Sequence, residues 1–225
     1  KLAEMGYTVG VFDFDGQAHQ SRCYKLKELK QTKDLKNCLI DQKPLVLDNC
    51  YSTNSENLYL MANQNSINSA LFSSFDFADI PYIFKNILTP IFDFAVIDCP
   101  PSLDAPAINA LVATDYILSP VEYSSFGMDS LEQLIKNVEA AKRYNSKLVL
   151  AGVYGSKVDM RYNLTNMSKV ALEKNLAGLV MNSYISMNSA FANAQAMNTD
   201  VFKLGDRKGV EQITNLTKEL LSRIK

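Results

Sequence analysis

The sequence has little of what marks several common classes of protein. It contains one histidine, His19, and four cysteines with neither C-x-x-C nor cysteine–histidine spacing, so it offers no site of that kind for a metal and predicts free thiols in a reducing compartment. No apolar run approaches the roughly 18 residues of a membrane span, and no signal peptide is recognisable. These absences predict a cytoplasmic protein without a stable membrane anchor.

A marked excess of charge of either sign is also absent. The 23 lysines and arginines nearly balance the 24 aspartates and glutamates, so any surface for nucleic acid or membrane must be local. With 225 residues, 47% of them hydrophobic and 21% charged, the composition is that of a globular protein. The length predicts a single domain over residues 1–225.

Apolar runs and amphipathic periods alternate along the chain. We expect strands at 7–15, 57–62, 92–98, 115–121, 147–155 and 179–185, and helices at 102–113, 128–144, 163–175 and the C-terminus. The alternation predicts an α/β fold, a mostly parallel sheet with helices on both faces. Residues 48–57 and 63–69 read as polar loops. The opening KLAEMG reads as the end of a helix closed by Gly6.

Two of the expected strands end in carboxylates. Asp13 and Asp15 follow YTVGVF, and Asp98 follows FAVI. The carboxyl ends of parallel strands are where α/β proteins bind ligands, and carboxylates there can hold Mg²⁺ or a water molecule. A single aspartate at such a position more often caps the next helix, but two such strand ends strengthen the functional interpretation.

Four segments around these acids resemble the ParA/MinD-type P-loop ATPases. VFDFDGQAH is similar to the family's D-x-D-P-Q signature, and FDFAVIDCPPSLDAPAINAL to its Walker B and switch II segment. SENLYLMAN and DYILSPVEYSSFGMDSLEQL are similar to two further family segments, in the same order and spacing. The resemblance covers residues 2–20 and 56–160 well and weakens toward the C-terminus. It implies a SIMIBI-like P-loop NTPase fold with ATP and Mg²⁺ as ligands.

The resemblance also implies roles for individual residues. Asp15 would orient the attacking water, Asp98 would hold Mg²⁺ through a coordinated water, and Asp13 would support metal and catalysis. Pro100 and Pro101 would stiffen the chain after Asp98, next to the nucleotide.

Elsewhere the resemblance is less complete. Gly16 stands where the family has proline, which is expected to loosen the loop that carries Asp15. The segment GSKVDMR (155–161) would approach the base, with Asp159 near the nucleotide.

The family's phosphate loop, K-G-G-x-G-K-[ST]-T, is missing. No G-x-x-x-x-G-K-[ST] and no Gly-Lys pair occurs in the 225 residues. The sequence therefore predicts half a nucleotide site, in a fragment that lacks the first strand, the phosphate loop and most of the first helix. The parent would be a Mg-dependent ATP hydrolase and the fragment inactive. The alternative is a non-enzymatic paralogue without a P-loop, which a start codon beside Lys1 would support.

Partner surfaces are less clear. Segment 22–36 is rich in lysine, which fits a phosphate-contacting patch but more often marks a solvated helix face. ParA proteins contact DNA through arginines where this chain has Met187 and Ala190, so the family's usual route is weakened. The C-terminal helix lacks the bulky aromatics of a membrane-targeting helix and is expected to pack on the domain. The remaining candidate DNA contacts are Arg161, Lys203, Arg207 and Lys208.

The function implied is that of a ParA-like ATPase in plasmid or chromosome partitioning. It would form an ATP-dependent homodimer, bind nonspecific DNA, and be stimulated by a ParB-type centromere-binding protein. The alternative is a MinD-like ATPase that cycles on membranes or positions cargo, for which vesicle binding would replace DNA retention.

Overall fold

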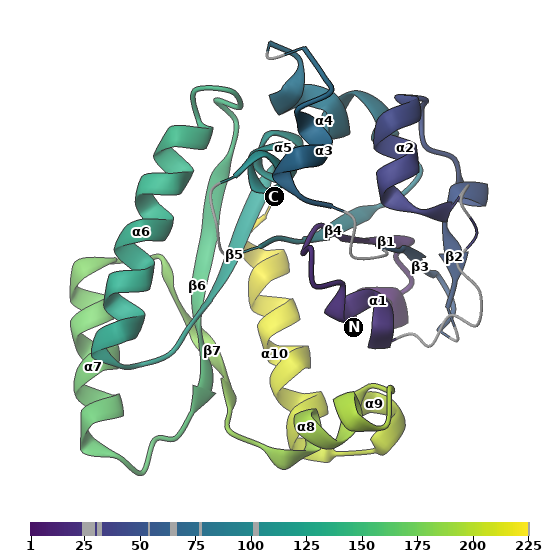
Figure 1. Ribbon diagram of the computed structural model, residues 1–225. Coiled ribbons are helices and arrows are strands. Elements are labelled where there is room, and N and C mark those ends of the chain that lie inside the picture. Colours follow the sequence, from purple (N-terminus) through teal and green to yellow (C-terminus); the bar gives the residue numbers. More distant parts are fainter. Residues whose placement is uncertain are drawn as a thin grey trace. The chain divides into compact units, whose positions relative to one another are not determined.

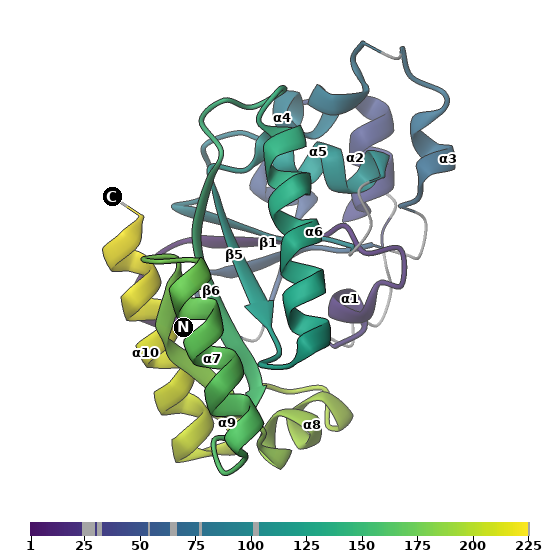
Figure 2. The same ribbon diagram turned by 90° about the vertical axis from the view of Figure 1, so that its left-hand side faces the viewer.

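The chain folds into two compact units, each built around its own parallel sheet. The computed structural model describes residues 1–23, 30, 33–53, 55–63, 67–76, 78–100 and 104–224. The first unit comprises Lys1–Thr114 with Tyr144–Ser146, and the second Asp115–Arg143 with Lys147–Lys225. Figures 1 and 2 show the two sheets with their helices.

The first unit contains a four-stranded sheet in the order β2-β3-β1-β4. Strand β1 pairs in parallel with β3 and β4, and only β2 is antiparallel. Its elements are η1 (Ala3–Met5), β1 (Val9–Asp13), α1 (His19–Cys23), α2 (Leu35–Asp41), η3 (Leu47–Asn49), β2 (Tyr51–Ser52), β3 (Leu58–Met61), α3 (Ser69–Phe72), η4 (Ile80–Tyr82), α4 (Ile83–Ile87), β4 (Phe94–Asp98) and α5 (Ala105–Ala113).

Alternation along β1 divides the core of this unit between the two faces of the sheet. Phe12 is fully buried in the larger cluster, under the helices drawn above the sheet in Figure 1. Val9 and Val11 lie in a smaller cluster on the other face with Leu60. All five residues of β1 are buried, as expected for a central parallel strand.

Strand β4 is less well covered than β1. Among the described residues it pairs only with β1. Val96 is paired in register with Val11, yet Val96 is 42% exposed and Val11 6%. The sequence FAVID is as apolar as a buried strand, so β4 is an edge strand with the composition of a central one.

The second unit contains the three-stranded parallel sheet β5-β6-β7. Helices α6 and α7 cover one face and α10 the other (Figure 1). Its elements are β5 (Tyr116–Val121), α6 (Ser125–Ala141), β6 (Val149–Val158), α7 (Asn163–Asn175), β7 (Val180–Ser186), α8 (Ser189–Ala196), α9 (Val201–Leu204) and α10 (Arg207–Arg223).

Helix α10 is fixed to this sheet by an ion pair that also binds the backbone. Glu219 accepts hydrogen bonds from the backbone N–H groups of Asn182 and Ser183, at 2.9 and 2.8 Å. Arg223 pairs with Glu219 at 3.0 Å and donates to backbone carbonyl oxygens around β6 and β7. The two side chains therefore satisfy backbone groups in and around β7.

Most of the sequence-based expectations for the fold are confirmed. The chain is α/β with predominantly parallel strands, α7 has the expected bounds, and α10 packs on its unit. Gly6 ends η1 with a φ of +93°, as a helix-closing glycine should. Cys23, Cys38, Cys50 and Cys99 are free thiols.

The loop predicted at 48–57 is wrong in part. Residues Tyr51 and Ser52 form β2, and the turn η3 precedes it. Strand β2 exists because β3 offers it an antiparallel partner, with Tyr51 opposite Leu60. Such pairing depends on residues distant in sequence, which local polarity does not reveal. The single domain over 1–225 stays a prediction.

Across the part of the chain that the structure describes, no helix has the length and hydrophobicity needed to span a lipid bilayer.

Candidate functional site

Three aspartates meet at the carboxyl ends of β1 and β4. Asp13 and Asp98 occupy paired register positions, so their side chains leave the sheet on the same face. The backbone N–H of Phe14 donates to the carbonyl oxygen of Asp98 at 2.9 Å, which extends the pairing beyond Asp13. The negative charges of Asp13 and Asp15 both contribute to the raised pKa of Asp98, so Asp15 also lies close enough to interact.

Asp13 is fully buried, and the structure shows hydrogen bonds to one of its two carboxylate oxygens. Its Oδ2 accepts hydrogen bonds from the backbone N–H and the hydroxyl of Ser21, at 2.8 and 2.7 Å. Its Oδ1 has no hydrogen-bond partner among the described residues. Burial raises the pKa of Asp13, and the hydrogen bonds from Ser21, with a smaller contribution from the backbone of Asp15, offset only part of that effect. A buried carboxylate oxygen without a partner is costly, which makes it a natural position for a cation or a metal-bound water.

Asp15 lies on a closely packed loop between β1 and α1. The backbone N–H of Gln17 donates to its carboxylate at 2.9 Å. The side-chain amide of Asn63 donates to its carbonyl oxygen at 2.8 Å. Next to it, a Cβ at Gly16 would lie 2.9 Å from the carbonyl oxygen of Ile67, so the loop leaves no room for a side chain there. This close approach accounts for glycine at position 16.

Asp98 lies in a negatively charged setting. Desolvation raises the pKa of its carboxyl, the charges of Asp13 and Asp15 raise it further, and His19 opposes them. Pro100 is the second residue after β4 and is half-buried, whereas Pro101 lies outside the described residues. Three neighbouring carboxylates with one histidine nearby form a site that favours a positive charge.

The donor set fits Mg²⁺ in part. Carboxylate oxygens are ligands that Mg²⁺ accepts, and the metal usually keeps several waters and takes further ligands from phosphate groups. No group of three or more histidine, cysteine, aspartate or glutamate side chains in the described ranges is arranged to hold a metal ion alone. Phosphate oxygens would therefore have to complete the coordination. The G-x-x-x-x-G-K-[ST] cradle for such phosphates is not in the sequence.

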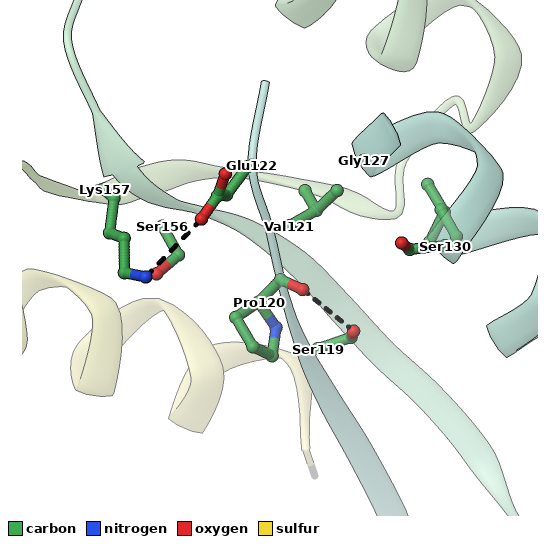
Figure 3. Close-up of a pocket in the computed structure, with 9 residues that line it drawn as sticks. Ser119, Pro120, Val121, Glu122, Gly127, Ser130, Ser156 and Lys157 are labelled. Carbon is green, nitrogen blue, oxygen red and sulfur yellow. Dashed lines mark hydrogen bonds and ion pairs between the residues drawn. The ribbon is translucent and has the colours of Figure 1, made fainter. Parts of the chain in front are cut away.

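A pocket in the second unit lies at the ends of β5 and β6 and the start of α6 (Figure 3). Its volume is about 350 Å³. Lys157 forms an ion pair with Glu122 at 3.6 Å across its mouth, and Ser156 lies beside this pair. Lys157 has a φ of +54° where the register of β6 against β7 shifts. A bulge and an unfavourable φ at a strand end are found more often next to functional sites than elsewhere.

Asp159 and Arg161 lie just after β6 and bind each other. The guanidinium of Arg161 donates to both carboxylate oxygens of Asp159, with an Nε–Oδ1 distance of 2.9 Å. Hydrogen bonds from Arg161 lower the pKa of Asp159 to about 2, and the charge of Lys208 contributes. Lys208 therefore lies close enough to Asp159 to interact with it, while Lys203 is paired with Asp200 at 3.8 Å.

The other positions considered for DNA binding differ in exposure and in their contacts. Arg207 is exposed at the start of α10. Ala190 is 9% exposed, so an arginine would not fit there without repacking, whereas Met187 is 67% exposed. Lys33, in the basic segment, donates to the carbonyl oxygen of Cys50 at 2.7 Å and packs on Tyr51. Residues 24–29 and 31–32 of that segment lie outside the described residues.

Sequence reasoning missed Ser21, Asn63 and the pocket of Figure 3 as parts of candidate sites. Ser21 and Asn63 are 42 residues apart and are joined by a 2.8 Å hydrogen bond. A serine eight residues after the strand-end acid carries no motif of its own. For the pocket, the available signal was the GSKVDMR segment, because it contributes Ser156 and Lys157.

Comparison with known proteins identifies the family. A family model described as "AAA domain" matches residues 1–150. The chain belongs to this family and is a member of the ParA/MinD-type P-loop ATPases. The sporulation initiation inhibitor protein Soj of Bacillus subtilis is 25% identical over 224 residues, covering 97% of this chain and 88% of Soj.

Solved structures show the same fold. An ATP complex of a McdA variant from Cyanothece has a TM-score of 0.83 at 17% identity and covers 97% of this chain and 87% of that one. A plasmid partition protein of Borrelia burgdorferi bound to AMPPNP has a TM-score of 0.79 at 18% identity, with 99% and 89% covered.

Proposed function

We propose that this chain is the Mg²⁺- and water-binding part of a ParA-like ATPase that dimerises on ATP and acts in DNA partitioning. The observation that carries the proposal is the meeting of Asp13, Asp15 and Asp98 at the ends of two adjacent parallel strands, with one buried carboxylate oxygen unpartnered. Related proteins that carry the names Soj and chromosome partitioning protein ParA support the partition role.

The residues have separate roles in this proposal. Asp98, the more exposed acid, would hold Mg²⁺ through a coordinated water, and Asp13 would accept a hydrogen bond from that water at Oδ1. Asp15 would orient the water that attacks the γ-phosphate. Bound Mg²⁺ would neutralise phosphate charge during transfer.

The phosphate cradle has to come from outside residues 1–225, and this makes the proposal testable. The chain alone should release no phosphate from ATP. A fusion that places the strand–phosphate loop–helix unit of Soj ahead of Lys1 should hydrolyse Mg-ATP and sediment as a dimer with ATP. In that fusion, Asp15→Ala should reduce phosphate release by about 100-fold or more while the ATP-bound dimer remains.

Asp41→Ala is the matched control, because Asp41 is an exposed carboxylate in the same unit with only a 3.9 Å pair to Lys43. It should leave hydrolysis unchanged. Hydrolysis that survives both Asp15→Ala and Asp98→Ala at the parental rate would refute the proposed site.

DNA binding is tested separately, by ATP-dependent retention of the fusion on nonspecific duplex DNA. Arg161→Ala combined with Lys208→Ala should weaken retention and reduce its salt dependence, because fewer phosphate charges are neutralised. Lys142→Ala, which removes an exposed lysine paired with Glu139, is the control. Equal retention by both variants would exclude the Arg161 surface, and vesicle binding in place of DNA retention would favour the MinD-like alternative.

A further inference from the structure

Ser21 connects the buried acid of β1 to the end of β3. Ser21 belongs to α1 and is 5% exposed. The hydroxyl donates to Oδ2 of Asp13 at 2.7 Å and accepts from the backbone N–H of Asn63 at 2.8 Å. Because a hydroxyl has one hydrogen and Asp13 Oδ2 is the acceptor, the direction of both bonds is fixed while Asp13 is ionised.

Asn63 in turn holds the loop of Asp15. It is 1% exposed and follows β3 by two residues, at a position set by the sheet. Its side-chain amide donates to the carbonyl oxygen of Asp15 at 2.8 Å, and the same oxygen accepts from the N–H of Ala18 at 2.9 Å. Gly16 gives this loop more backbone freedom than any other residue would, so an external contact is needed to fix it.

We propose that Ser21 and Asn63 are positioning residues for the two acids of the β1 loop. Ser21 holds the Asp13 carboxylate through Oδ2, which leaves Oδ1 for a metal-bound water. Asn63 fixes the position of Asp15 relative to the sheet through its side chain. It also acts on Asp13, because its backbone N–H binds Ser21. The inference rests on the proposed function for its purpose, but its contacts are tested without hydrolysis.

The test is NMR on the 225-residue chain. Ser21→Ala should speed amide hydrogen exchange at Asn63 by about fivefold, because the hydroxyl that accepts the Asn63 N–H at 2.8 Å is lost. Asn63→Ala should speed amide hydrogen exchange at Gln17 and Ala18 by about fivefold, as expected for one lost hydrogen bond. Exchange in the centre of β1, for example at Val11, should not change.

Matched controls separate positioning from general loss of stability. Asn145→Ala removes another buried asparagine of the same unit, whose amide donates to the carbonyl of Thr114 at 2.6 Å, and should leave Gln17 and Ala18 unaffected. Ser21→Thr retains the hydroxyl and should restore the protection of the Asn63 amide. Unchanged exchange at Asn63 in Ser21→Ala, or equal acceleration of exchange throughout the sheet, would overturn the proposal. Unfolding of both alanine variants would do the same, since the network would then hold the fold and not the acids.

The Soj fusion separates this inference from the proposed function. In an active fusion, Ser21→Ala should lower kcat about tenfold or more with little change in the KM for ATP, because the acids bind metal and water and not the nucleotide base. An inactive parent fusion with the expected NMR changes would refute the function and leave the contacts standing. An active fusion in which Ser21→Ala keeps full kcat would refute the positioning role.

Discussion

Replacing Arg223 by alanine should destabilise the second unit more than any other change on the polar side of α10. Its guanidinium donates to Glu219 and to four backbone carbonyl oxygens, those of Ala151, Gly178, Leu179 and Val180, at 3.0–3.2 Å. The Arg223 and Glu219 side chains are only 21% and 16% exposed, so water replaces these bonds incompletely. Removing one partner of such a pair, and its bonds to the backbone, should cost about 3 kcal/mol.

Amide hydrogen exchange at Asn182 and Ser183 is the direct measurement. Both amides donate to Glu219, whose carboxylate loses its partner in Arg223→Ala, so their protection should fall together with the free energy of unfolding in urea. The free energy of unfolding of Arg223→Lys should lie between those of the parent and Arg223→Ala, because lysine retains the charge but not the planar guanidinium group. Lys218→Ala, on the exposed side of the same helix, is the control. A cost below about 1 kcal/mol, or one equal to that of the control, would refute the reasoning.

The same contact predicts a pH dependence. Burial raises the pKa of Glu219, but the hydrogen bonds from Ser183, Asn182 and Arg223 outweigh it and lower the pKa below its ordinary 4.5. A carboxyl with a lowered folded-state pKa contributes stability above its ordinary pKa and loses it as the pH falls through the folded value. The destabilisation by Arg223→Ala should therefore shrink on acidification below pH 4.5, and a constant difference down to pH 2 would contradict the assignment.

Three further changes have defined outcomes. Gly10→Ala places a Cβ 2.7 Å from the ring of Phe92 and should cost about 1–3 kcal/mol in urea unfolding, with recovery in the double variant with Phe92→Leu. Gln42→Gly should raise the melting temperature by relieving a φ of +49° at the end of α2, and no rise would show that the residue is unstrained. Burial and neighbouring acids raise the pKa of Asp98, so its charge opposes folding once the pH exceeds that pKa; Asp98→Asn should stabilise the chain at pH 7 and not at pH 3.

The strands and the long helices were predictable because their signal is local. β1 and β4 are continuous apolar runs, and α6 repeats its apolar residues at helical spacing, with Leu131 and Val138 buried as that spacing requires. The aspartates at the two strand ends were predictable as neighbours for the same reason, since parallel strands align their carboxyl ends.

What the sequence did not reveal depends on contacts between distant residues. Helices α8 and α9 have weak amphipathic patterns, and their only local signals are the capping residues Asn188 and Asp200, which bond the first turns. The C-terminal helix was expected to pack on the domain, but its sequence did not show that Glu219 and Arg223 bind the β7 backbone. Such pairings follow from how the chain packs, and no spacing rule encodes them.

The uncovered side of β4 has a consequence for anyone who prepares this chain. Within the residues that the structure describes, β4 pairs with β1 on one side and with no strand on the other, and Val96 is 42% exposed, a combination that recruits extended segments from other molecules. In concentrated samples the folded protein should therefore oligomerise through pairing of strands at this edge. Val96→Lys places a charge on this edge of β4 and should keep the protein monomeric in concentrated samples.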